Sequence, residues 1–194
     1  MSTASVTSRP GAVLADLLPA SRTKSIALVV GGAALTGIAA QISVPVPGSP
    51  VPVSGQTFAA LLVGTALGAR RGFLSLALYA VVGMAGMPWF AQGASGYAMP
   101  SFGYILGMTL AATAVGALAR RGADRSVLRT AGAMAAGSVI IYAVGVPYLA
   151  LATGMTLSQA VAAGLTPFLI GDALKAALAM GALPTAWKLI GRRG

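Results

Sequence analysis

The sequence predicts an all-α polytopic membrane protein with six transmembrane helices. Of its 194 residues, 57% are hydrophobic and only 8% are charged, whereas about a quarter of the residues in a soluble domain are charged. Three long stretches contain no Asp, Glu, Lys or Arg: Ser25 to Ala69, Gly72 to Ala119, and Thr130 to Gly171. Because one crossing needs only about 20 apolar residues, these stretches are long enough for several spans.

The division into helices follows the basic clusters and the segments rich in Pro and Gly. At a rise of about 1.5 Å per residue, an apolar helix of about 20 residues crosses ~30 Å of hydrocarbon. The second and third predicted spans are short, which tilting, extension into the loops or local thinning of the bilayer would accommodate. The predicted spans are Ser25 to Ile42, Gly55 to Ala69, Gly72 to Met87, Ser101 to Ala119, Val127 to Leu151, and Gly164 to Trp187.

The basic residues outside the spans all fall on one side of such a six-helix arrangement. The three loops on the other side, 43–54, 88–100 and 152–163, carry no charge. Cytoplasmic loops of membrane proteins are enriched in Lys and Arg, so both termini are expected in the cytoplasm. The basic groups are Arg9, Arg22 and Lys24, then Arg70 and Arg71, then Arg120 to Arg129, and finally Lys188 to Arg193.

Residues 1–24 are predicted to form a mobile cytoplasmic tail, and residues 25–194 the transmembrane domain. The tail is rich in Ser, Thr, Ala and Arg, a composition that buries little apolar surface. A cleaved signal peptide is the alternative, because Arg22 and Lys24 precede an apolar stretch. That stretch is nearly as long as a full span, which favours an uncleaved first helix.

Composition excludes several classes of function. The chain has no Cys and no His, which excludes disulfides, thiolate catalysis, imidazole bases and the usual zinc and haem ligands. No cofactor and no metal site are therefore expected. The net charge of +10 is explained by the basic loops, so no binding of nucleic acid is expected. No G-x-x-x-x-G-K-[ST] loop is present, and the chain is not expected to bind nucleotide itself.

Asp172 and Lys175 interrupt the last apolar run. Being three residues apart, they share one face of a helix. Counted from Gly164, they lie ~12 Å and ~16 Å along the helix axis, inside the hydrocarbon, where ionisable groups are costly and usually functional. One interpretation is an ion pair that neutralises itself within the bundle. The other is a ligand whose carboxylate meets Lys175 while its N–H donors meet Asp172.

The uncharged loops on the predicted outer side are not simple connectors. Segment 43–55 carries four prolines, which favour extended backbone. Segment 87–101 combines Trp89, Phe90 and Gln92 with several glycines. One interpretation is a lid over a small, mostly apolar pocket, and the alternative is a belt of aromatic rings at the membrane interface.

Three further polar side chains fall near the outer ends of predicted spans. They are Gln56, Tyr104 and Tyr148. Each either contacts a ligand or forms a hydrogen bond with a neighbouring helix, as polar groups in membrane helices commonly do. The predicted substrate-binding set is Asp172, Lys175, Gln56, Trp89, Phe90, Gln92, Tyr104 and Tyr148.

The first span carries small residues four positions apart. Such spacing permits close approach of helices, either within the bundle or against a partner membrane subunit. The candidates for contact with a partner helix are Ala27, Gly31, Ala33 and Gly37, and the related small residues are Gly32, Thr36 and Ala40.

Five segments together resemble the BioY family of biotin-specific S components of energy-coupling factor (ECF) transporters. The resemblance extends from about Ile26 to Ile190. The segments are Pro-Val-Pro-Val-Ser-Gly-Gln-Thr at 50–57, Leu-Gly-Ala-Arg-Arg-Gly at 67–72, Gly-Met-Pro-Trp-Phe-Ala at 86–91, Gly103-Tyr104, and Pro167-Phe168 with Gly171, Asp172 and Lys175.

The resemblance implies the six-helix ECF S-component fold and a location in a bacterial or archaeal-type plasma membrane. It implies high-affinity binding of biotin on the outer side for ATP-dependent uptake, with a transmembrane coupling subunit and two cytoplasmic ATPase subunits as partners. It also implies that Gly-Asp-x-x-Lys in the last helix contacts the substrate. The chain is then a transporter subunit and not an enzyme.

Three alternatives stay open from the residues alone. The first is a self-contained channel or facilitator for a small polar solute, with Asp172 and Lys175 along its pathway. The second is an S component for a different vitamin. The third, an intramembrane hydrolase, is disfavoured because His and Cys are missing and only one acid lies within a span.

Overall fold

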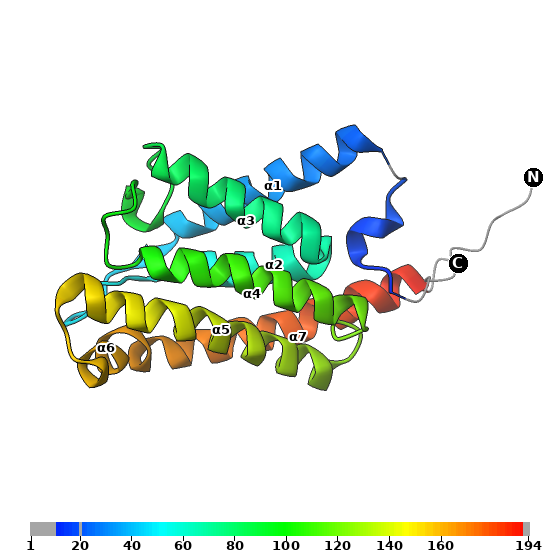
Figure 1. Cartoon of the computed structure of the whole chain (residues 1–194). Helices are drawn as coiled ribbons and strands as arrows, with labels where there is room; N and C mark the ends of the chain where they lie inside the picture. Colours follow the sequence, from blue (N-terminus) through cyan, green and yellow to red (C-terminus); the bar gives the residue numbers. More distant parts are fainter. Residues whose placement is uncertain (1–10, 20, 192–194) are drawn as a thin grey trace, which may run out of the picture.

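The computed structural model describes residues 11–19 and 21–191, and helices dominate them (Figure 1). Two very short strands form the only sheet in this part of the chain. In chain order the elements are η1 Leu14–Leu17, α1 Arg22–Gln41, β1 Ser43–Val44, β2 Val53–Ser54, α2 Gln56–Leu67, α3 Ala69–Met84, η2 Ala91–Gly93, α4 Phe102–Arg120, α5 Val127–Thr153, α6 Leu157–Gly164, η3 Thr166–Phe168 and α7 Leu169–Gly191.

The helices α1 to α5 match the first five predicted spans to within three residues at every end. Four helical stretches are long and apolar enough to cross a membrane: Arg22–Gln41, Phe102–Arg120, Val127–Thr153 and Leu157–Leu189. In contrast, α2 has 12 residues and α3 has 16, so neither reaches the ordinary length of a span. The two short spans expected from the sequence are thus short helices.

Large apolar side chains cover the outside of this helical bundle. Ile38 is 66% exposed, Leu151 86% and Ile170 85%. A water-soluble protein rarely exposes contiguous apolar surface of this extent. The exposed faces fit a surrounding of lipid, as the composition predicts.

The sixth predicted span is divided into separate elements, which corrects the prediction of one helix beginning at Gly164. The short helix α6 occupies most of the predicted loop 152–163. Its start is fixed by a capping box, in which Thr156 accepts from the N–H of Gln159 and Gln159 accepts from the N–H of Thr156. Pro167 then stands in η3, and α7 begins only at Leu169. The charged pair therefore lies near the start of its helix.

Helix α4 is central and packs against α2, α3 and α5 (Figure 1). Three glycines bring the backbones of α2, α3 and α4 into direct contact. A Cβ atom on Gly64 would collide with the backbone of Ala112, one on Gly72 would lie 2.9 Å from Cα of Gly64, and one on Gly116 would lie 2.5 Å from the amide nitrogen of Ala69. Only glycine permits these approaches.

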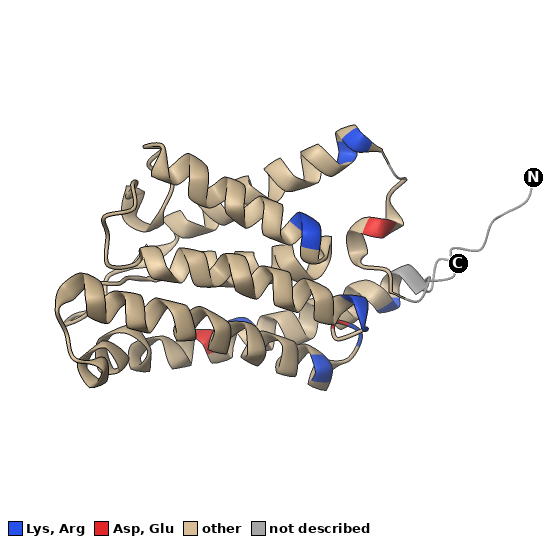
Figure 2. Cartoon of the chain, in the orientation of Figure 1, with Lys and Arg blue, Asp and Glu red and all other residues tan. Residues whose placement is uncertain are grey.

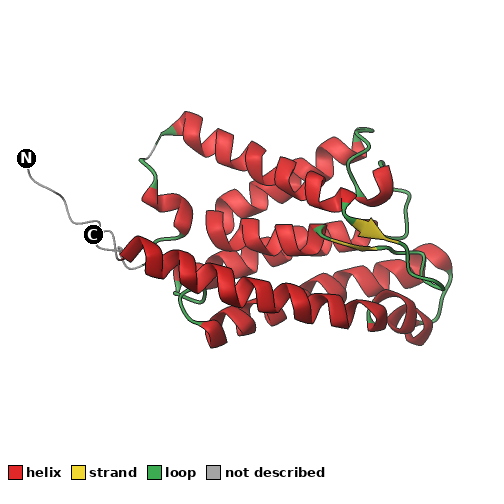
Figure 3. Cartoon of the chain, turned by 180° about the vertical axis from the view of Figure 1, so that it is seen from behind, coloured by secondary structure: helices red, strands yellow, loops and turns green. Residues whose placement is uncertain are grey.

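Charge is distributed unevenly along the bundle (Figure 2). Lys and Arg gather at the right-hand end, whereas the loops at the left-hand end carry no charge. The left-hand end holds the β1–β2 hairpin, which Figure 3 shows from behind in yellow. In this hairpin Ser43 pairs with Ser54 and Val44 with Val53, so only the two ends of the predicted extended segment form strands, and the residues between them, with the four prolines, do not.

Residues 11–18 pack against the basic end of the bundle. Val13 is fully buried, and Asp16 forms ion pairs with Arg71 at 3.0 Å and Arg120 at 3.3 Å. Arg125 donates to the carbonyl of Ala12 at 3.2 Å. This part of the predicted tail is therefore packed, whereas residues 1–10 lie outside the described residues.

Candidate functional site

Asp172 and Lys175 form an ion pair in the first two turns of α7. Nζ of Lys175 lies 3.1 Å from Oδ1 of Asp172, and their side chains are 18% and 16% exposed, respectively. Asp172 lies in the first turn of the helix, where the unpaired backbone N–H groups favour a negative charge. The shared helix face expected from the three-residue spacing is confirmed, and the observed ion pair is the geometry of the first of the two interpretations, whereas contact with a ligand stays a prediction. The pair lies nearer the start of its helix than the sequence analysis placed it.

Two residues that the sequence analysis did not select complete this cluster. The hydroxyl of Tyr142 in α5 donates to Oδ2 of Asp172. Nζ of Lys175 donates to Oγ1 of Thr57 in α2 at 2.8 Å. The cluster thus joins α2, α5 and α7, and each of the two charged groups has one neutral hydrogen-bond partner. Tyr142 could have been selected as a hydroxyl in an apolar span, and Thr57 as the neighbour of Gln56.

Two spaces adjoin Asp172. The first is a groove of about 650 Å³ between α5, α6 and α7. The second is a cavity of about 10 Å³ next to Lys175, which has room for about one water molecule. The groove is almost entirely apolar, with Tyr142, Asp172 and Ser138 as its side chains that carry polar groups. Leu157 and Val161 of α6 and the following Leu165 also line it.

The β1–β2 hairpin reaches the start of α7. A Cβ atom on Gly171 would lie 3.7 Å from Cγ1 of Val53, and Gly171 is the residue before Asp172. Val53 also lies just upstream of Thr57, which contacts Lys175. The end of the proline-containing segment therefore lies beside the charged cluster, and its role as a lid stays a prediction.

Trp89 and Phe90 pack on the other side of the bundle, against α1 and α3. The indole of Trp89 covers Gly37 and donates to the carbonyl of Tyr79 at 3.0 Å. Phe90 is 1% exposed and fills the space next to Gly83. Both rings also contact the ring of Tyr79. None of these contacts involves the charged cluster, so a role for the two rings in binding stays a prediction.

The amide of Gln56 turns toward this aromatic cluster. Its Oε1 accepts from the hydroxyl of Tyr79 at 2.8 Å. Gln92 is exposed, with a φ of 60° in the loop that follows Phe90. The structure brings neither side chain into contact with Asp172 or Lys175.

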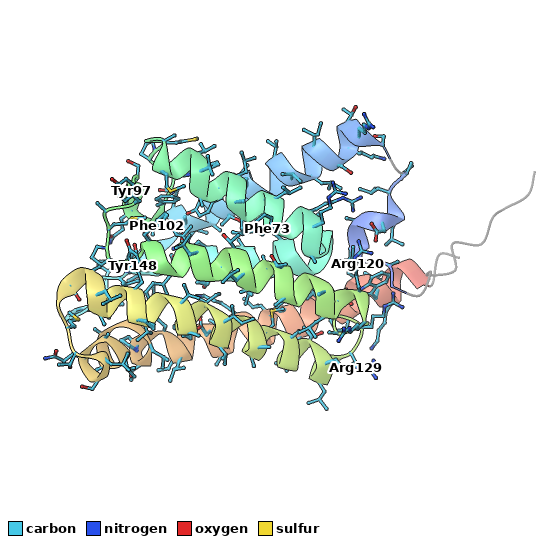
Figure 4. The ribbon with its side chains drawn as sticks, viewed as in Figure 1. Phe73, Tyr97, Phe102, Arg120, Arg129 and Tyr148 are labelled. Atoms are coloured by element: carbon cyan, nitrogen blue, oxygen red, sulfur yellow. The ribbon has the colours of Figure 1, made fainter. Side chains whose placement is uncertain are left out.

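Tyr104 and Tyr148 form hydrogen bonds with neighbouring segments, the alternative that their sequence positions left open. The hydroxyl of Tyr104 donates to the carbonyl of Gly164 at 2.7 Å, and that of Tyr148 to the carbonyl of Tyr97 at 3.1 Å. Figure 4 shows Tyr97, Phe102 and Tyr148 close together at the end opposite Arg120. These bonds hold α6 and the 87–101 loop in place, and contact with a ligand stays a prediction.

The small residues of α1 divide into two faces. Ala33 and Gly37 are buried within the bundle, whereas Ala27 and Gly31 are exposed. A Cβ atom on Gly31 would have no neighbour within 4 Å, but one on Gly32 would collide with Ser75. Half of the predicted partner-contact set therefore packs internally, and Ala27 and Gly31 remain on an open face.

A second cluster holds the opposite end of α7. Asp124 is 1% exposed, and Oδ2 accepts from Nε1 of Trp187 at 2.6 Å. The guanidinium of Arg125 lies 4.5 Å from the centre of the Trp187 ring. Burial raises the pKa of the Asp124 carboxyl above its ordinary value, although the bond from Trp187 and the charge of Arg125 oppose the shift. Oδ1 of Asp124 and Nε of Arg125 are buried without a hydrogen-bond partner among residues 11–19 and 21–191.

No metal centre is indicated by the described residues. Among residues 11–19 and 21–191, there is no group of three or more His, Cys, Asp or Glu side chains that could hold an ion. The cluster of Asp172, Lys175, Tyr142 and Thr57 offers one carboxylate, one ammonium and two hydroxyls beside an apolar groove.

Comparison with known proteins gives consistent matches. The model of the BioY family matches residues 9–192. A probable biotin transporter BioY of Lysinibacillus sphaericus is 37% identical over 145 residues, covering 74% of this chain and 73% of that protein. A probable biotin transporter BioY of Pyrococcus horikoshii is 35% identical over 162 residues, covering 82% and 93%.

A solved structure has the same fold. It is the crystal structure of the S-component for biotin from an ECF-type ABC transporter. It superposes with a TM-score of 0.77 at 19% identity and covers 88% of this chain and 95% of that one. At this level of identity the similarity concerns the fold.

Proposed function

The chain belongs to the BioY family, and on this premise we propose that it is a membrane-embedded subunit that binds biotin with high affinity for uptake by an ECF transporter. The observation that carries the proposal is the Asp172–Lys175 pair beside an apolar groove. The relatives with assigned names are transporters, and a role as an enzyme is not proposed.

The two charges complement the two polar ends of biotin. The ammonium of Lys175 pairs with the carboxylate of the valerate chain, and the carboxylate of Asp172 accepts from the N–H groups of the ureido ring. Bonds between a charged group and its partner are about twice as strong as neutral ones. The groove, at about 650 Å³ and mostly apolar, has the size and character of a small-molecule site and takes the apolar rings of the ligand.

The outer segments close the site. The β1–β2 hairpin lies against the first turn of α7 through Val53 and Gly171, and its prolines limit the conformations of its backbone. The 87–101 loop, with Trp89 and Phe90, is the second part of the lid. Gln56, Gln92, Tyr104 and Tyr148 are further contacts once the ligand is bound.

The chain crosses the membrane six times with both termini in the cytoplasm, and residues 25–194 form the substrate-binding domain. Every Lys and Arg drawn in Figure 2 other than Lys175 lies near one end of the bundle, which supports this orientation. The short helices α2 and α3 complete the six crossings where the bilayer adapts to their length.

Transport requires partners because the chain has no nucleotide-binding loop. The partners are a transmembrane coupling subunit and two cytoplasmic ATPase subunits. The exposed small residues Ala27 and Gly31 of α1 give the coupling subunit a face for close helix contact.

Calorimetric titration of the purified protein with biotin tests this function. The variants Asp172→Ala and Lys175→Ala are each expected to bind about 100-fold more weakly, because either change leaves a poorly hydrated charge without its partner. Asp16→Ala, at the basic end of the bundle, is the matched control and should bind as the unchanged protein does. Tight binding by both site variants would contradict the proposed roles.

Reconstitution without partners separates this function from a channel. Vesicles that contain only this chain should bind labelled biotin that stays with the protein when the membrane is dissolved in detergent, with no accumulation of free biotin inside. Passage of biotin into the lumen would favour a self-contained facilitator. Titrating the purified protein with other vitamins in the same calorimetric assay, and comparing their affinities with that of biotin, decides whether biotin is the ligand.

A further inference from the structure

Tyr142 and Thr57 hold the charged pair from two different sides. Tyr142 lines the large groove and Thr57 lines the small cavity, whereas Asp172 lines both. Tyr142 donates to Oδ2 of Asp172, and Thr57 accepts from Nζ of Lys175. Each charged group thus has its own neutral partner, and the two partners come from different helices.

These bonds leave a defined hydrogen-bonding capacity unused. A carboxylate accepts about four hydrogen bonds and an ammonium donates about three. Asp172 already accepts from Tyr142 and Lys175, and Lys175 already donates to Asp172 and Thr57. About two acceptor positions on Asp172 and about one N–H on Lys175 remain. The remainder matches a ligand with two N–H donors and one carboxylate.

We propose that Tyr142 and Thr57 are positioning residues that determine specificity, each for a different part of the ligand. The inference rests on the proposed binding of biotin by Asp172 and Lys175. Tyr142 fixes the carboxylate of Asp172 so that its free acceptor positions meet the ureido N–H groups. Thr57 fixes the ammonium of Lys175 so that its free N–H meets the ligand carboxylate. Groups held in place before binding lose less conformational freedom when the ligand arrives.

Affinities for three ligands separate the two roles. The ligands are biotin, its amide, in which a neutral group replaces the carboxylate, and a biotin analogue whose ureido nitrogens are methylated. The unchanged protein should prefer biotin over both analogues. Tyr142→Phe should bind biotin about tenfold more weakly and discriminate less against the methylated analogue, with its preference over the amide unchanged.

Thr57→Val should give the opposite pattern. Its preference for biotin over the amide should fall about tenfold, while its discrimination against the methylated analogue stays. Thr57→Ser restores the hydroxyl and should restore the preference. Thr65→Val is the matched control on the same helix, because the Thr65 hydroxyl bonds only to Leu61 of its own helix at 2.7 Å. It should behave as the unchanged protein does.

In the expected result each variant loses discrimination against only one of the two analogues. A purely structural role of Tyr142 or Thr57 would not produce this difference. Equal weakening for all three ligands, or no change in either variant, would overturn the positioning roles while leaving the binding of biotin intact. If the unchanged protein does not bind biotin, or does not discriminate against either analogue, the proposed function itself fails. Thermal unfolding of each variant in detergent verifies that the proteins compared are folded.

Discussion

The two ends of α7 are held by two different kinds of carboxylate. Near the start of the helix, both oxygens of Asp172 are paired, with Tyr142 and with Lys175. Near its end, Asp124 accepts from Trp187 through one oxygen, and the other is buried with no partner in the part of the chain that the structure describes. A buried oxygen without a hydrogen-bond partner, such as Oδ1 of Asp124, costs free energy, and because it is buried a ligand cannot reach it.

This difference is the one expected between the proposed ligand site and a structural anchor. Asp172 lines a groove of about 650 Å³, so that the polar groups of a visiting molecule can reach its carboxylate, and Lys175 lies beside it on the small cavity. Asp124 is 1% exposed and shares its surroundings with Arg125 and Trp187. We therefore expect changes near the start of α7 to alter binding, and changes near its end to alter stability.

The largest effect is expected for Lys175→Met. This change keeps the length and apolar stem of the side chain but removes the ammonium, so Asp172 keeps only Tyr142 as a partner. Biotin should bind about 100-fold more weakly, because the ligand carboxylate and Asp172 both lose their cation. Isothermal titration in detergent measures the change. A loss smaller than about threefold would place the carboxylate of the ligand elsewhere.

Trp187→Phe should destabilise the protein without changing the site. It removes the only hydrogen bond that the structure shows from another residue to the Asp124 side chain, and it weakens the contact with Arg125. We expect a loss of about 2 kcal/mol in unfolding free energy. Far-UV circular dichroism during heating measures it. Biotin affinity of the folded variant serves as the comparison, and a large loss of affinity would mean that this end of α7 is coupled to the site.

Asp124→Asn should make stability less dependent on pH. Burial raises the pKa of Asp124 above the ordinary 3.8, so the folded protein favours the neutral carboxyl. The stability that this neutral form contributes is fully present below 3.8 and is lost as the pH rises through the raised pKa. Melting temperatures across this acidic window should fall for the unchanged protein relative to the variant. Parallel curves would show that Asp124 does not titrate differently on folding.

The smallest effect is expected for Asp16→Asn. Asp16 joins Arg71 and Arg120 at the basic end, but its side chain is 28% exposed and that of Arg120 is 47% exposed. Ion pairs of this kind contribute less than about 1 kcal/mol and weaken in salt. Thermal unfolding at low and high salt should show a slight destabilisation only at low salt. A loss as large as that of Trp187→Phe would give residues 11–18 a greater structural role.

The helices and the charged pair could be predicted from local sequence patterns. The charge-free stretches and basic clusters located α1 to α5, and the three-residue spacing brought Asp172 and Lys175 to one helix face. The start of α6 and the later start of α7 were also encoded locally, by the Thr156–Gln159 capping box and by Pro167, but apolarity alone predicted a loop over 152–163 and one helix from Gly164.

The partners of the charged pair could not be derived in this way. Thr57 is 118 residues from Lys175, and Tyr142 is 30 residues from Asp172, so their contacts depend on how whole helices pack. The position of Trp89 could not be derived locally either, because its ring packs against Gly37 in α1, which is far away in the sequence. The sequence shows that these side chains are polar or aromatic residues in apolar surroundings. It does not show which neighbour each of them contacts.

The three glycines between α2, α3 and α4 have a mechanical consequence. Gly64, Gly72 and Gly116 place the main chain of one helix directly against that of the next. At these contacts no flexible side chain lies between the helices to let them slide past each other. These three helices therefore behave as one stiff block, and their amide hydrogens should exchange more slowly than those of α7. A force applied by a partner at the basic end would tilt that block as a unit, and the deformation would be left to the helices around it.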